Sequence, residues 1–180
     1  MQTSFYPLAD SSYKRWQPIE AGAREPEPHE QRLLDAVERA IDAGCFYNTD
    51  VNAAVKADFG AYLRPEDAAR NHSGVQGGDF EYEVYHARRV LDARRAAKAL
   101  SDAEAELNLQ PGTHLGSLVF SSDFKLNTGC TVAAIDGHDV KITGKRGRYI
   151  VTITTNALSI KHAMDRAFGR GKRKTATLGA

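Results

Sequence analysis

The stretch CTVAAIDGHDVKITGKRGRYIVTIT, residues 130–154, decides the fold class of this chain. Three short runs rich in β-forming residues lie within it, at 130–135, 140–143 and 149–154. Turn residues separate them at 136–139 and 144–147, and the Asp136-Gly137 dipeptide is a strong hairpin signal. The stretch therefore predicts an antiparallel meander, either an open sheet or a small barrel.

Working outward, a fourth β-forming run at 115–120 precedes this stretch and a helical pattern over 156–168 follows it. The helix presents one apolar face, formed by Ala157, Ile160, Ala163, Met164, Ala167 and Phe168. These elements predict a small antiparallel β-sheet or barrel closed by a C-terminal helix. We place this basic domain at 110–170 and a basic tail at 171–180.

The preceding part, 30–109, predicts three to four helices, so the fold class is α+β. Leu33, Leu34, Val37 and Ile41 form one stripe of a helix over 30–43. A second helix begins at Thr49 or Asp50, and a long one covers 79–100. Ser101–Glu104 has the pattern of a capping box, which predicts a break and a short helix to Leu107.

Residues 1–29 contain four prolines, at positions 7, 18, 26 and 28. Because proline fixes its own φ and lacks an amide donor, we expect an extended N-terminal strap. Tyr6, Tyr13 and Trp16 are candidates to anchor this strap on the body of the protein. The alternative is a flexible arm that becomes ordered only on binding.

The net charge of +1 conceals a division of charge between the two parts of the chain. Residues 1–110 carry 13 Lys+Arg against 19 Asp+Glu, a net of −6, whereas residues 111–180 carry 11 against 4, a net of +7. Such asymmetry favours an anionic partner at the basic end. It also permits attraction between the two parts, within one chain or between two.

Ten basic residues of the C-terminal part are the candidate binding site for nucleic acid: Lys141, Lys145, Arg146, Arg148, Lys161, Arg166, Arg170, Lys172, Arg173 and Lys174. Cations of this kind neutralise phosphates and release counterions without reading base sequence. Thr143 can add a hydrogen bond and Tyr149 can stack on a base. The alternative is a solvated positive face that attracts the acidic helices of the same chain.

No motif for catalysis, a cofactor or a metal ion is present. The six histidines stand singly, and the glycines of 74–78 lack the lysine of a phosphate-binding loop. Glu83 and His86 have half of a di-iron spacing without a second copy, which indicates an exposed pair on one helix face. We therefore predict no catalytic, cofactor-binding or metal-binding residues.

The sequence indicates a cytoplasmic protein with no membrane partner. No apolar run reaches the roughly 18 residues that a membrane span needs, and the N-terminus lacks a signal-peptide pattern. Cys45 and Cys130 are far apart, which excludes a disulfide framework and favours a reducing compartment. A single buried disulfide between the two parts is the alternative.

Three functions are compatible with these features. The first is a non-enzymatic accessory protein whose basic C-terminal domain binds nucleic acid or a nucleoprotein complex, while the helical region binds a protein or self-associates. The second is a protein-binding inhibitor or adaptor, of the kind that phages and mobile elements encode, without affinity for nucleic acid. The third is an enzyme whose site is assembled from distant residues.

Overall fold

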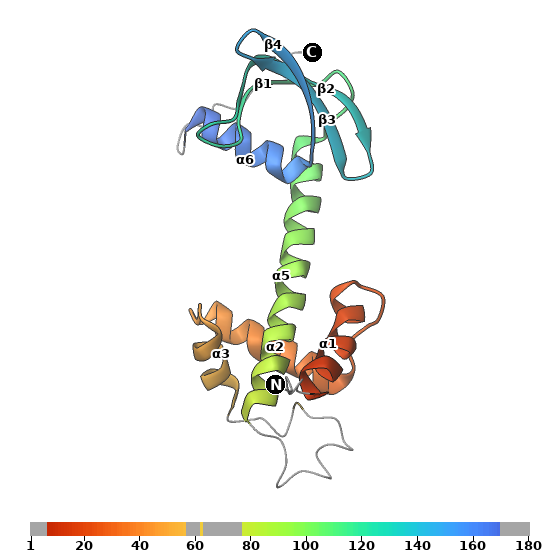
Figure 1. The fold of residues 1–180 in the computed structure, drawn as a ribbon, viewed down its shortest axis with the longest axis vertical. Helices are drawn as coiled ribbons and strands as arrows, with labels where there is room; N and C mark the ends of the chain where they lie inside the picture. The colour runs from red at the N-terminus through yellow and green to blue at the C-terminus, as the bar shows by residue number, and fades with distance from the viewer. Residues whose placement is uncertain (1–6, 57–61, 63–76, 170–180) are drawn as a thin grey trace, which may run out of the picture. The chain divides into compact units, whose positions relative to one another are not determined.

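The computed structural model describes residues 7–56, 62 and 77–169, and the chain divides into two compact units, residues 1–96 and 97–180. The predicted α+β class is confirmed, because helices precede a four-stranded antiparallel sheet and one helix follows it (Figure 1). The division falls within α5 (Gly77–Leu107), earlier than the predicted boundary at residue 110. The last turns of α5 belong to the second unit, since Ala103 is buried and Leu107 packs on the core of the sheet.

The first unit consists of α1 (Pro7–Glu20), α2 (Pro28–Asp42), α3 (Asn48–Val55) and the first turns of α5. α2 begins with a capping box between Glu27 and Glu30 and has Pro28 at its first position, where a missing amide donor costs nothing. Its apolar stripe is buried at Leu33, Leu34 and Val37. The same core includes residues of α1, α3 and α5, namely Trp16, Ile19, Val51, Val55, Val84, Ala87, Val90 and Leu91.

The expectation of an extended strap is wrong for residues 7–20, which form α1. Pro7 stands at the first position of the helix and Pro18 in its last turn, so neither proline interrupts the central turns. Trp16 anchors α1, with only 1% of its surface exposed. Tyr6 lies outside the described residues.

The predicted break at Ser101–Glu104 is also wrong, because α5 continues from Gly77 to Leu107. The carboxylate of Asp102 accepts a hydrogen bond from Nζ of Lys98 (2.7 Å). This pairing is the i, i+4 interaction of a continuous helix rather than a cap. The helix instead changes its packing partner along its length, since Val84 and Leu91 belong to the first core whereas Leu107 packs on the second.

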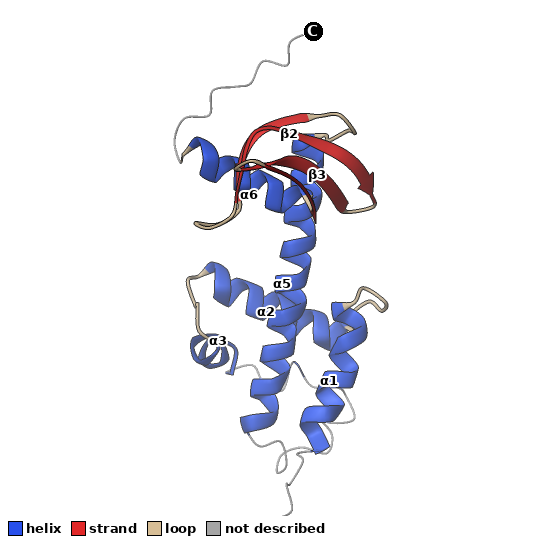
Figure 2. Ribbon diagram, turned by 45° about the horizontal axis from the view of Figure 1, so that its top comes forward, coloured by secondary structure: helices blue, strands red, loops and turns tan. Residues whose placement is uncertain are grey.

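The second unit is an open sheet in the order β1-β2-β3-β4, followed by α6 (Ala157–Phe168). Its strands are β1 (His114–Val119), β2 (Lys125–Asp136), β3 (Asp139–Arg146) and β4 (Tyr149–Thr155). The sheet curls over α6, as Figures 1 and 2 show. Between sheet and helix lies a core that contains Leu118, Leu126, Val132, Val140, Ile142, Ile160 and Ala163. The side chain of Asn156 caps α6 by accepting a hydrogen bond from the amide of Ser159 (2.9 Å).

Two glycines shape this sheet. Gly116 has a φ of 72° and stands where the register between β1 and β2 shifts, so it forms an irregularity that bends the strand. Gly144 was expected in the turn at 144–147, but it lies within β3 opposite Val151. There a Cβ atom would come within 2.8 Å of Sγ of Cys130, so close packing requires a glycine. The observed turn is Gly147-Arg148.

Both cysteines, Cys45 and Cys130, are free thiols. Cys130 is buried in the sheet core, and this burial raises the pKa of its thiol. Within the described ranges, no helix offers an apolar stretch long enough to cross a bilayer.

Candidate functional site

The alternation of side chains along β3 determines which of its cations lie on the outer face of the sheet. Val140, Ile142 and Gly144 are buried on the face that covers α6. Successive residues of a strand point to opposite faces, so Lys141, Thr143 and Lys145 lie on the outer face. Both lysines are exposed there.

Lys141, Lys145 and Arg148 make no ion pair with any residue that the structure describes. Arg148 belongs to the exposed turn between β3 and β4, where its guanidinium lies 5.3 Å from the ring centroid of Tyr149. Tyr149 is itself 63% exposed. These three cations are therefore available to an external anion, and the ring beside Arg148 can stack on a flat ligand.

A row of hydroxyl groups crosses the outer face between the two lysines. Thr131 of β2 pairs with Thr143 of β3, which pairs in turn with Thr152 of β4. The hydroxyl oxygens of Thr143 and Thr152 are 3.0 Å apart. Lys141 and Lys145 flank this row at the adjacent positions along β3, where they face Thr154 and Ile150 of β4. The outer face thus combines two ammonium groups with neutral hydrogen-bonding groups.

Three other predicted cations form hydrogen bonds or ion pairs within the second unit. Nη2 of Arg146 donates to the carbonyl oxygen of Asp123 (3.2 Å), and its guanidinium lies 5.0 Å from the centroid of Phe124. Arg166 donates to the carbonyl oxygen of Phe120, and Lys161 pairs with Glu106. Arg146 and Arg166 therefore hold the connection between β1 and β2.

The structure does not describe the remaining four predicted cations, which are Arg170, Lys172, Arg173 and Lys174. The predicted tail at 171–180 also lies outside the described residues. The ten candidates thus fall into three groups: three unpaired cations on the outer face and its turn, three that support the fold, and four that the structure does not describe.

The end of the sheet at the turn between β2 and β3, opposite to the turn that carries Arg148, is acidic. Asp136 and Asp139 flank the turn between β2 and β3, and both are exposed. His138 in that turn lies 2.7 Å from a carboxylate oxygen of Glu104, and this hydrogen bond together with the charge of Glu104 raises the pKa of His138. An anion would therefore bind more favourably at the Lys145 end of β3 than at the Asp139 end.

The helical unit contains a buried ionic cluster that the sequence did not reveal. Glu30 is 1% exposed and lies 2.9 Å from Nη1 of Arg24 and 3.3 Å from Nε of Arg15. Burial alone would raise the pKa of Glu30, but hydrogen bonds from Arg24 and the amide of Glu27, together with the charges of Arg24 and Arg15, lower it. This carboxylate stays ionised and joins the α1–α2 connection to α2, which is a structural role.

Glu83 and His86 do not form the exposed pair that their spacing predicted. Glu83 accepts a hydrogen bond from Nε1 of Trp16 (2.6 Å) and pairs with Arg15. His86 is 6% exposed, and its ring lies 5.9 Å from that of Tyr13. Among the described residues, no group of three or more metal-ligating side chains is close enough to hold an ion.

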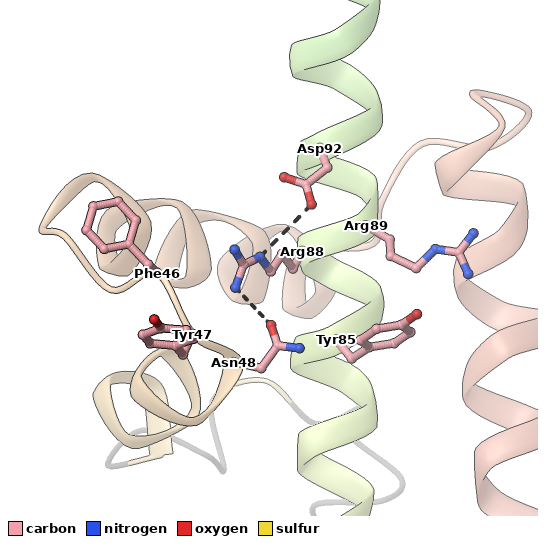
Figure 3. A pocket seen from close by; sticks show the side chains of 7 residues that line it. All are labelled: Phe46, Tyr47, Asn48, Tyr85, Arg88, Arg89 and Asp92. Carbon is pink, nitrogen blue, oxygen red and sulfur yellow. Dashed lines mark hydrogen bonds and ion pairs between the residues drawn. The ribbon is translucent and has the colours of Figure 1, made fainter.

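A shallow cavity of about 480 Å³ lies beside α5 in the helical unit (Figure 3). Phe46 and Tyr47, from the loop before α3, are 73% and 74% exposed at its rim. Arg88 lies between Asn48 and Asp92 and donates to Oδ1 of Asn48 (2.9 Å). The other lining residues are Tyr85 and Arg89. Aromatic and arginine side chains of this kind are typical of protein-binding surfaces.

The sequence did not reveal this surface, although it contains one signal of it. Phe46 and Tyr47 are consecutive aromatics in the connection between α2 and α3, outside both helices. Large apolar side chains with no core position to occupy indicate a contact surface.

No protein-family model matches this chain, and no curated protein or solved structure matches it either. The function is therefore inferred from the chemistry of the described residues.

Proposed function

We propose that this protein is a non-enzymatic nucleic-acid-binding protein and that the outer face of its C-terminal sheet binds the phosphate backbone. The observation that carries the proposal is that Lys141, Lys145 and Arg148 are exposed on and beside the outer sheet face and form no ion pair with any described residue. A cation that has no internal partner gives up no existing ion pair when it binds a phosphate. The proposal covers nucleic acid alone or within a nucleoprotein complex.

The spacing of the two lysines suits a polyanion. Lys141 and Lys145 are four residues apart on one strand, which corresponds to about 13 Å. Nucleotides of one strand of duplex DNA rise by about 3.4 Å along the helix axis, so a β-strand lying along that axis would separate the two lysines by roughly four nucleotides. Thr143 lies between them and can donate a hydrogen bond to an intervening phosphate. Such contacts give affinity without base specificity.

The test replaces Lys141, Lys145 and Arg148 together by alanine and measures binding to a labelled mixed-sequence duplex by fluorescence anisotropy. If all three contact phosphates, the slope of log affinity against log salt flattens by about 0.9 for each contact, or roughly 2.7 in total. The same series on a single strand should give about 0.7 for each contact.

The matched control removes three exposed cations from the acidic unit, Arg39, Lys56 and Arg94, which changes the net charge equally. Arg146 is left intact because its loss would disturb the connection that contains Asp123 and Phe124. If the two triple variants weaken binding equally, net charge alone explains the interaction, and the hypothesis of a defined binding face is refuted. An unchanged salt slope in the sheet variant would refute the proposal altogether.

Protein binding through the helical unit is the second candidate function. It is favoured by the exposed side chains of Phe46 and Tyr47 at the rim of the cavity beside α5. An affinity pull-down after nuclease treatment, compared between the natural chain and a Phe46→Ala/Tyr47→Ala variant, tests it. Loss of a captured protein only in the variant would support an adaptor role, and identical captures would exclude this surface.

A further inference from the structure

The two edges of the C-terminal sheet differ in how they are protected. Exposed edge strands pair readily with other strands, and proteins protect them with charges, prolines, bulges or a covering element. The β1 edge has such protection, because its register shifts at Gly116 and α6 packs against it. β4, the opposite edge, has the sequence YIVTITT without a charged residue, proline or glycine.

β4 is also a regular strand. Its seven residues pair in an unbroken register with β3, from Tyr149 opposite Arg146 to Thr155 opposite Val140. Backbone groups of alternate residues in an antiparallel strand point to opposite sides. With Arg146 and Tyr149 closing the two-residue turn, the groups of Ile150, Thr152 and Thr154 point to the open edge. Within the described part of the chain, no strand pairs with that edge.

We propose that β4 pairs with β4 of a second copy of this chain in an antiparallel, two-fold symmetric dimer. A two-fold axis at Thr152 places each Val151 opposite the Ile153 of the other copy on the inner face. On the outer face it places each Ile150, which is 72% exposed, opposite the Thr154 of the other copy. Each cross-strand pair then consists of two apolar side chains, two hydroxyl-bearing side chains, or one of each kind. No pair brings like charges together.

The lysines of β3 do not oppose this pairing. Lys145 of one copy and Lys141 of the other lie in one row across the dimer, because Lys145 pairs with Ile150 and Lys141 with Thr154. Three strand spacings of about 4.8 Å separate them, or about 14 Å. That distance exceeds the Debye length of about 8 Å at physiological salt, so their repulsion is largely screened.

The symmetry also explains why the assembly ends at two copies. Pairing of β4 with β4 leaves only the two β1 edges of an eight-stranded sheet, and each β1 edge is protected as described above. A closed two-fold contact produces a dimer rather than a fibre. The inference does not depend on nucleic-acid binding, although the dimer would place two basic outer faces on one continuous sheet.

The experiment uses the full chain after nuclease treatment and measures mass by sedimentation equilibrium over a range of concentrations. We expect a concentration-dependent shift from the 19.7 kDa chain to twice that mass. Thr152→Lys places two ammonium groups opposite each other at the axis and should raise the dimer dissociation constant about tenfold. Thr143→Lys is the matched control, because it adds the same charge to the same outer face and removes the same hydroxyl contact one strand away from the edge.

Cysteine cross-linking provides a second readout that does not depend on a destabilising variant. In a Cys45→Ser background, Thr152→Cys should form an intermolecular disulfide on oxidation, because paired strands bring the two Cα atoms to about 5.5 Å. Thr143→Cys should not, because its copies would lie about 14 Å apart. A monomer at all concentrations would overturn the proposal. So would equal dimerisation of the two lysine variants, which would indicate self-association through the helical unit, or equal cross-linking at the two positions.

Discussion

Replacement of Gly144 by alanine should destabilise the C-terminal unit by about 1–2 kcal/mol. The new Cβ atom would lie 2.8 Å from Sγ of Cys130 and 3.4 Å from Cβ of Leu126. Overpacking of this kind destabilises the folded state by about 1–3 kcal/mol. Alanine also lowers the conformational entropy of the unfolded chain, which offsets about 0.4–1 kcal/mol of that loss. Sγ of Cys130 cannot move freely, because it is buried and donates to the carbonyl oxygen of Asn127 (3.1 Å).

A double-mutant cycle with Cys130→Ala isolates that contact. Removing Sγ leaves Leu126 as the nearest atom group to the alanine at 144, at an ordinary contact distance. The double variant should therefore be more stable than the sum of the single variants predicts, by about 1 kcal/mol. Hydrogen exchange of peptides that cover 125–155, followed during urea unfolding, measures the free energy of unfolding of this unit alone. A Gly144→Ala variant within about 0.5 kcal/mol of the natural chain, or strict additivity in the cycle, would refute the packing argument.

Two predictions concern the helical unit. Trp16→Ala should cost about 3–5 kcal/mol, measured by urea unfolding with circular dichroism, because the indole is 1% exposed and donates to Glu83. Smaller losses would show that α1 contributes little to the core. Stability should also fall as the pH drops below about 6.5, because burial lowers the pKa of His29 and of His86. The unfolded state then binds protons that the folded state excludes. Fluorescence of the single tryptophan, followed in urea at pH 7.5 and 5.5, measures this dependence, and equal stability at the two values would contradict it.

The local pattern of the sequence predicted the C-terminal unit well. Runs of β-forming residues, the Asp136-Gly137 turn and the apolar face of α6 are short-range features, and they lie within the observed elements β2 to α6. The failures arose where a local signal competed with its surroundings. Ser101–Glu104 has a capping pattern, but Asp102 pairs with Lys98 on a continuous helix. Pro7 and Pro18 suggested an extended segment, but both stand at helix ends, where proline is tolerated.

The candidate site shows the same limit. From composition alone, Lys141, Lys145, Arg146 and Arg148 form one basic cluster. The structure separates Arg146 from the others, because its partners are Asp123 and Phe124, more than twenty positions earlier in the chain. A residue type and its charge are properties of the sequence, whereas the partner that satisfies the charge depends on which distant segments meet.

The sequence by itself determined the α+β class, the four β-forming runs, the closing helix and the concentration of positive charge after residue 110. All of these depend on spacing along the chain, because side chains alternate in strands and repeat every three or four residues in helices. Only the tertiary structure decided that Lys141 and Lys145 lack ion pairs among the described residues, that Gly144 makes room for Cys130, and that β4 is an edge strand with no second neighbouring strand in the described part of the chain. These properties depend on contacts between residues far apart in the chain, and no local period encodes such contacts.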